Sequence, residues 1–70
     1  MKMLKIGDKI KDTEDSDCYF VGDVVKLNRF GGVEYYKVTQ VIWNGEDYTD
    51  DDYIGQIIEP KWWYIQLFLF

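Results

Sequence analysis

Short β-rich runs separated by turn signals occur along the whole chain, and they restrict the fold more than any other feature. Hydrophobic residues make up 47% of the sequence and aromatic residues 19%, and Val, Ile, Tyr, Phe and Trp all favour strands. Ala, the strongest helix former, is absent. No window shows the i, i+3, i+4, i+7 apolar stripe of an amphipathic helix. The sequence therefore predicts an all-β protein with at most one short helix.

Five runs are expected to form strands. They are Ile6–Lys11, Tyr19–Asn28, Val33–Trp43, Tyr53–Glu59 and Trp62–Phe70. In the second run, Val21, Val25 and Leu27 are expected on one face. Five short strands without a helix to cover them must close on themselves, which predicts a small five-stranded SH3-like barrel, with an OB-like barrel as the alternative.

Glycine-containing turns are expected to connect these runs. The segment Asn28–Gly32 (NRFGG) predicts a turn, because glycine adopts positive φ without steric cost. Asn44-Gly45 is the strongest hairpin signal in the chain. The segment after it, Glu46–Asp52 (EDYTDDD), is expected to be a solvated acidic loop with room for one helical turn.

One six-residue pattern, [Ile/Val]-Gly-Asp-x-[Ile/Val]-Lys, occurs twice, at Ile6–Lys11 and at Val21–Lys26. Glycine suits a bend or bulge at which a loop enters a strand. The Asp that follows can bond to nearby backbone amides. We therefore expect the chain to enter a strand twice in the same way, with an internal duplication as the alternative.

A chain of 70 residues predicts a single domain, residues 1–70, and the missing residue types restrict its chemistry. There is no His and only one Cys, Cys18, so Cys–His nucleophiles, His acid–base catalysis and zinc fingers lack a required part. We expect no enzymatic activity, no catalytic residues and no cofactor. Cys18 is expected to be a half-buried apolar residue. Neither a signal peptide nor an apolar run of membrane-spanning length is visible, which predicts a cytoplasmic protein without a membrane partner.

Two resemblances add to this interpretation. The pattern GDxV, followed by a glycine turn and by YKVTQVIWNG, resembles SH3-like, Tudor and KOW-type barrels. The segments GDKIKDTEDSDCYFVGDVV and IIEPKWWYI are similar to small uncharacterised proteins of tailed phages, including marine ones. That family carries no assigned activity. The second resemblance implies a protein that works in the cytoplasm of a host cell.

Charge argues against nucleic acid as a partner. The net charge is −5, and binding of phosphates requires a basic stripe that this sequence lacks. The acidic runs Asp12–Asp17 and Asp50–Asp52 supply oxygen ligands that Ca²⁺ prefers, but they lack the spacing of an EF-hand loop. We expect them to be solvated loops, with no metal site.

Aromatic residues provide the candidate interaction surface. In the last run the even positions form a face almost as apolar as the odd one, so a barrel strand would expose it to solvent. Two further tyrosines lie within the acidic loop and directly after it. The predicted surface comprises Trp62, Tyr64, Phe68, Phe70, Tyr48 and Tyr53. Packing in the core and rim is the plainer role for such rings, and a groove for a proline-rich peptide or a cage for a methylated lysine is the alternative.

The sequence thus predicts a non-enzymatic module that binds a protein segment or assembles with itself, most simply as a homodimer covered along the even face of the last run. A second hypothesis is a phage-borne acidic effector that blocks a basic nucleic-acid-binding site on a host protein. The acidic charge and the phage resemblance support this alternative.

Overall fold

The structure is a computed structural model that describes residues 4–15, 17–60 and 66–67. Within these residues the chain forms strands and no helix, so the predicted all-β class is confirmed. The strands are β1 (Lys9–Asp15), β2 (Cys18–Leu27), β3 (Val33–Trp43), β4 (Glu46–Tyr48), β5 (Ile57–Ile58) and β6 (Gln66–Leu67).

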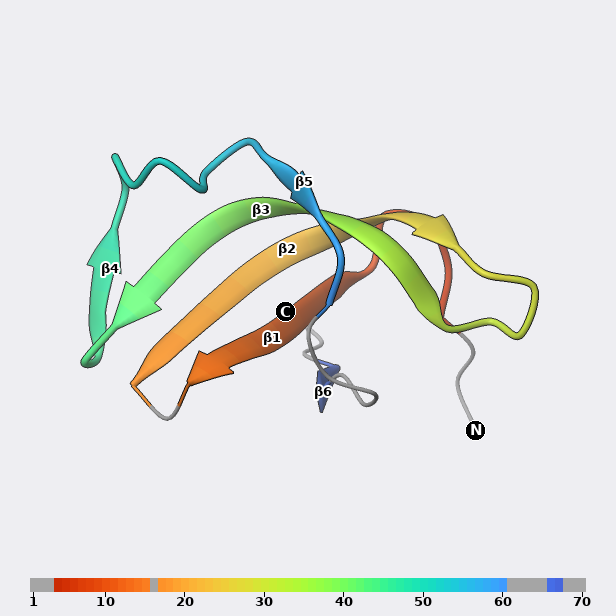
Figure 1. Ribbon diagram of the computed structural model, residues 1–70, viewed down its shortest axis with the longest axis horizontal. Coiled ribbons are helices and arrows are strands. Elements are labelled where there is room, and N and C mark those ends of the chain that lie inside the picture. Colours follow the sequence, from red (N-terminus) through yellow and green to blue (C-terminus); the bar gives the residue numbers. More distant parts are fainter. Residues whose placement is uncertain (1–3, 16, 61–65, 68–70) are drawn as a thin grey trace.

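One antiparallel sheet contains all six described strands, with the order β4-β3-β2-β1-β6 and with β5 paired to β3 outside this order (Figure 1). The β4 and β5 strands share one edge of β3, where β4 pairs with Val41–Trp43 and β5 pairs with Tyr36 and Lys37. The long strands β2 and β3 curve across the molecule (Figure 1). Within the described residues no pairing joins β6 to β4 or β5, so the sheet is not closed into a barrel.

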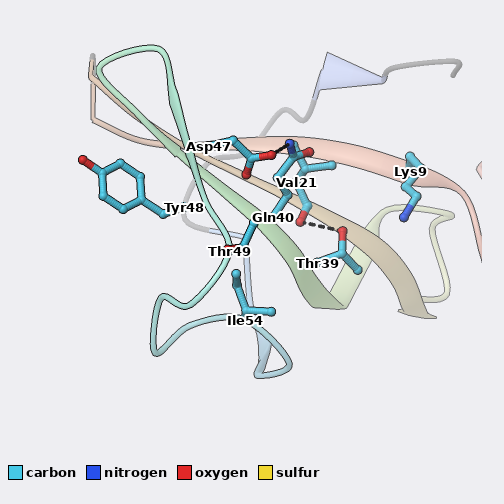
Figure 2. Close-up of a pocket in the computed structure, with 8 residues that line it drawn as sticks. All are labelled: Lys9, Val21, Thr39, Gln40, Asp47, Tyr48, Thr49 and Ile54. Atoms are coloured by element: carbon cyan, nitrogen blue, oxygen red, sulfur yellow. Dashed lines mark hydrogen bonds between the residues drawn. The ribbon is translucent and has the colours of Figure 1, made fainter.

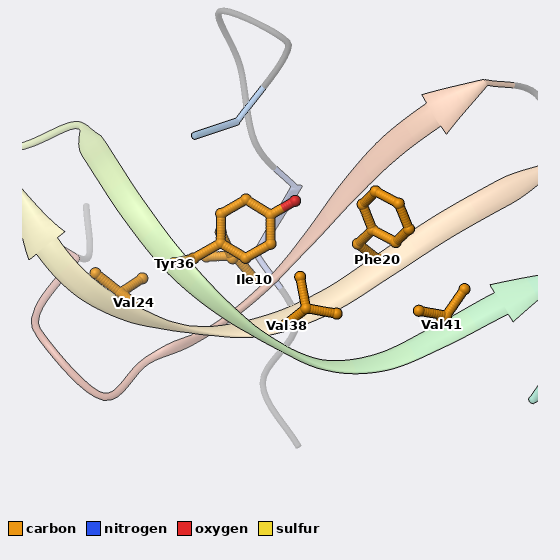
Figure 3. Packing of buried hydrophobic residues seen from close by; sticks show 6 residues of the cluster. All are labelled: Ile10, Phe20, Val24, Tyr36, Val38 and Val41. Atoms are coloured by element: carbon orange, nitrogen blue, oxygen red, sulfur yellow. The ribbon is translucent and has the colours of Figure 1, made fainter. Parts of the chain in front are cut away.

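The hydrophobic core lies on one face of β1, β2 and β3 (Figure 3). Its buried members are Ile10, Phe20, Val24, Tyr36, Val38 and Val41. The expectation that Val21, Val25 and Leu27 share one face does not describe this core. Phe20 and Val24 supply the β2 side chains of the cluster, because they lie on the opposite side of the strand from Val21.

Tyr36 ties the three long strands together. Its ring is fully buried, and its hydroxyl donates a hydrogen bond of 2.8 Å to Oδ2 of Asp12. Asp12 is itself only 3% exposed. A buried carboxylate must be hydrogen-bonded to be tolerated. The bond therefore fixes β3 relative to β1 across the intervening β2.

Gly22 provides the space that Tyr36 occupies. A Cβ at position 22 would collide with Cδ2 of the Tyr36 ring and would lie 2.6 Å from the carbonyl oxygen of Lys37. The register between β2 and β3 also shifts between Val21 and Gly22. Glycine in a strand interior commonly marks such a bulge or a close approach. Here it marks both.

The repeated hexads turn out to be partners in the sheet. Lys9 lies opposite Asp23, and Ile10 lies opposite Gly22. The backbone bonds from Gly7 N to Val24 O (2.9 Å) and from Val24 N to Asp8 O (2.9 Å) continue the pairing. The expectation of two equivalent strand entries is wrong, however. Gly7 precedes β1 with a φ of 97°, whereas Gly22 lies inside β2.

Several strand boundaries differ from the predicted ones. β1 begins at Lys9 and extends through the acidic residues up to Asp15, because these residues pair with β2. The Glu46–Tyr48 part of the expected acidic loop forms β4. The hairpin turn at Asn44-Gly45 is confirmed, with φ values of 52° and 78°. Of the fourth predicted run, only Ile57–Ile58 is a strand.

The tight approach at Gly22 predicts a large cost for a small change. Gly22→Ala should lower the free energy of unfolding by about 1–3 kcal/mol, the usual cost of overpacking a core. Chemical denaturation measures this difference. Lys37→Ala, at an exposed neighbouring position, is the control and should change stability far less. A Gly22→Ala protein as stable as the wild type would contradict the close approach of Tyr36.

Candidate interaction surface

The β3–β4 hairpin presents aromatic rings and carboxylates together. Trp43 is the last residue of β3, and it is 52% exposed. Its ring lies 6.0 Å from the ring of Tyr48, measured between centroids, at an angle of 44°. Trp43 pairs with Glu46 across the turn, and Ile42 pairs with Asp47. We call Trp43, Glu46 and Tyr48 the hairpin surface; Asp47 lies on the other face of the hairpin, where it accepts a hydrogen bond from Gln40.

The turn residues fix the geometry of this surface. Positive φ at both Asn44 and Gly45 is typical of a two-residue type I′ turn, whose twist matches that of the flanking strands. Asn44 N also donates a hydrogen bond of 2.9 Å to the carbonyl oxygen of Asp17, which anchors the turn to the start of β2. The two rings are therefore held on a short, well-anchored hairpin.

Tyr48 is also linked to a carboxylate of the same surface. Its hydroxyl donates a hydrogen bond of 3.2 Å to Oε2 of Glu46. This bond raises the pKa of Tyr48 above its ordinary value of 10.0, and desolvation and the negative charge of Glu46 act in the same direction. The hydroxyl thus stays protonated and keeps its bond throughout the neutral range.

Negative charge is concentrated around the hairpin surface. The segment from Val38 to Gln56 contains five acidic residues and no basic one. The acids are Glu46, Asp47, Asp50, Asp51 and Asp52. Asp51 uses one carboxylate oxygen to accept a bond of 2.9 Å from Tyr53 N, which shapes the loop after β4. This loop follows β4 directly, so its charges add to those of the hairpin surface.

The two described tyrosines of the predicted surface have different surroundings. Tyr48 is half-buried and packs against the edge of the core. Tyr53 is 45% exposed, and its ring lies 5.0 Å from that of the core residue Phe20. Tyr53 therefore covers the core rather than joining the Trp43–Tyr48 pair. Its role is closer to the rim packing considered from the sequence.

The other predicted surface residues are Trp62, Tyr64, Phe68 and Phe70, and they lie outside the described residues. Of their segment, only β6 is described, and it pairs with β1 through Ile10–Leu67 and Lys11–Gln66. The dimer expected along this segment stays a prediction.

An open hollow of about 400 Å³ lies beside the hairpin. Figure 2 shows Tyr48 and Lys9 at opposite ends, with Gln40 and Asp47 between them. Its size is that of a small-molecule pocket, but such pockets place polar groups so that they can reach a ligand. Here the polar groups bond to the protein instead. Gln40 donates a hydrogen bond of 2.8 Å to Asp47, Lys9 pairs with Asp23 at 2.8 Å, and Thr39 donates a bond of 3.1 Å to Val21 O.

Three further features of the described residues bear on function. No group of three or more acidic or Cys residues is arranged to hold a metal ion within the part of the chain that the structure describes. Cys18 is half-buried and packs against the core, as predicted. In the same described residues, no helix is long and apolar enough to cross a membrane.

Comparisons with known proteins found no match. The chain matches no protein-family model, no curated protein and no solved structure. The resemblances noted in the sequence therefore stay hypotheses, and the functional argument rests on the surface itself.

Sequence reasoning did not select Trp43 for the candidate surface, although the signal was present. Trp43 is the last strand residue before the Asn44-Gly45 turn, and its side chain is exposed. Phe30 was also missed. It lies in the turn between β2 and β3 and is 83% exposed. In both cases position relative to a turn is the informative feature.

The hydrogen bond in the hairpin surface predicts a shift in titration. Glu46→Gln should lower the pKa of Tyr48 toward 10.0, because the carboxylate that raises it is removed. A raised pKa in the folded state adds stability that is present below pH 10 and lost as the pH rises through the folded value. Ultraviolet difference titration of tyrosinate formation measures the shift. Asp47→Asn is the control, and an equal shift in both variants would contradict the role of Glu46.

Proposed function

We propose that this protein is a non-enzymatic interaction module whose hairpin surface docks a positively charged segment of a protein. The observation that carries this proposal is the exposed Trp43 ring beside Tyr48 and Glu46, in a segment that contains no basic residue. In the neighbouring hollow, the bond between Gln40 and Asp47 and the pairing of Lys9 with Asp23 support a role without catalysis.

Aromatic residues are effective at such a surface for a physical reason. Trp and Tyr bury a large area while losing little side-chain entropy, and they are enriched among residues that dominate binding energy. A Trp ring also attracts Lys and Arg by a cation–π interaction within about 6 Å. Because the type I′ turn already holds the two rings in place, little further ordering is required on binding.

The acidic residues define the chemistry of the partner. Carboxylates around an aromatic centre attract a basic segment and speed its association, and they repel acidic competitors. The surface is small, so the expected interaction is weak and transient. A lysine- or arginine-containing segment with an apolar or aromatic residue fits these features best.

The five acids between Val38 and Gln56 also favour the second candidate function. In that function the acidic end covers a basic nucleic-acid-binding site of a host protein, and the resemblance to tailed-phage proteins supports it. Competition separates the two candidates. Under the second one, a short oligonucleotide displaces this protein from its target, and binding falls steeply with salt.

The proposal is tested by titrating the isotope-labelled protein with a peptide of alternating Lys and Pro around one central Phe. Nuclear magnetic resonance should show shifts confined to the hairpin surface. Trp43→Ser should weaken binding about tenfold, which corresponds to about 1.4 kcal/mol.

Ile57→Ser provides the matched control, since Ile57 is 60% exposed but lies on β5. This variant should bind the peptide as the wild type does. Shifts spread over the whole surface, or equal binding by a peptide with Glu in place of Lys, would overturn the proposal.

A further inference from the structure

The turn between β2 and β3 carries an exposed aromatic and a cation at its tip. Phe30 is 83% exposed, and the guanidinium carbon of Arg29 lies 4.9 Å from the centre of its ring. Within the described part of the chain, Arg29 forms no ion pair. We call Arg29 and Phe30 the turn tip.

Asn28 holds the backbone of this tip. Its Oδ1 accepts hydrogen bonds from Phe30 N (2.9 Å) and Gly32 N (3.0 Å). The backbone N–H of Asn28 donates a hydrogen bond to Gly32 O (2.8 Å), and the backbone carbonyl oxygen of Asn28 accepts one from Gly31 N (3.0 Å). Gly31 takes a φ of 85°, which glycine adopts at no steric cost. The tip is thus fixed before any partner arrives, which lowers the entropy cost of binding.

The turn tip and the hairpin surface lie at opposite ends of the molecule. β3 begins just after the first turn and ends at the second, and Figure 1 places the two turns at the two ends of the longest axis. The molecule measures 33 Å along that axis. One copy can therefore use both features at once, each toward a different neighbour.

Charge differs between these two ends. From Val24 to Lys37 there are three basic residues, Lys26, Arg29 and Lys37, and one acid, Glu34. Lys26 is paired with Glu34 at 3.3 Å. The segment from Val38 to Gln56 has five acids and no base. A basic tip with an exposed ring matches the partner that the hairpin surface requires.

We infer that the occupant of the hairpin surface is the turn tip of a second copy of this chain, which gives head-to-tail association. This inference rests on the proposed function and names its partner. Phe30 of one copy packs against Trp43 and Tyr48 of the next, and Arg29 lies near Glu46. Because the two contacting surfaces differ, the contact is heterologous and not two-fold, and since the surfaces lie at opposite ends of the molecule (Figure 1) we expect short open chains. A contact between one turn and one hairpin buries little area, so we expect weak association. Because the contact pairs exposed charges, we also expect salt to weaken it.

Complementation between two disabled variants is the test. The tip variant, Arg29→Glu with Phe30→Ser, keeps an intact hairpin surface. The hairpin variant, Trp43→Ser with Glu46→Lys, keeps an intact tip. Analytical ultracentrifugation at sub-millimolar concentration and low ionic strength should show association of the wild type, weakened about tenfold or more in each variant alone. An equal mixture of the two variants should form dimers and stop at that size.

Other outcomes separate this inference from the proposed function. If the wild type associates and the mixture stays monomeric, or if either variant alone associates as the wild type does, the head-to-tail contact is wrong. A wild-type dimer that neither variant weakens would point to another surface, such as the one predicted along Trp62–Phe70. If the wild type is monomeric, the inference fails, while the peptide titration still decides the proposed function. Circular dichroism of each variant shows whether it is folded. The single change Arg29→Glu repeats the tip variant with a smaller perturbation.

Discussion

The rest of the structure depends on the close approach of Tyr36 to Gly22. The ring of Tyr36 occupies the space that a side chain at position 22 would fill, and its hydroxyl reaches Asp12 on the strand beyond. One side chain of β3 thereby touches β2 and bonds to β1. Because the Tyr36 ring is fully buried and its hydroxyl bonds to a buried carboxylate, this contact sets how β3 lies across its neighbours.

The position of β3 in turn determines what the molecule presents to a partner. β4 and β5 both pair with the same edge of β3, and the exposed rings of Phe30 and Trp43 lie at its two ends. The stretch from Val24 to Lys37 is net basic and the stretch from Val38 to Gln56 is acidic, and the two meet in the middle of this strand. A strand held along the molecule therefore separates the two kinds of charge as well as the two exposed ring systems. Fold and candidate function are connected through β3.

Local chemistry made part of this structure predictable. Asn44-Gly45 favours a type I′ hairpin on its own, and Val33–Trp43 has strand-forming residues throughout, so both predictions are confirmed. The acidic residues of Glu46–Tyr48 predict a loop and not a strand. β4 forms nevertheless, because pairing with β3 outweighs the weak strand preference of Glu and Asp. The core face of β2 was also missed, since Gly22 and its bulge matter only once Tyr36 lies above them. The pairing between the two hexads was also not predicted from the sequence. They pair with each other, a long-range relation that a repeat alone does not reveal.

The candidate site was predictable in kind but not in position. Aromatic residues beside carboxylates are predictable from the sequence, and Tyr48 belongs to that group, whereas the contact of the exposed Trp43 ring with Tyr48 depends on the pairing of β3 with β4. The most direct test of head-to-tail association is small-angle X-ray scattering of the wild type over a concentration series at low ionic strength. The account predicts that the largest dimension grows steadily with concentration, while the cross-section stays constant. A particle that doubles in mass and then stops growing would contradict it.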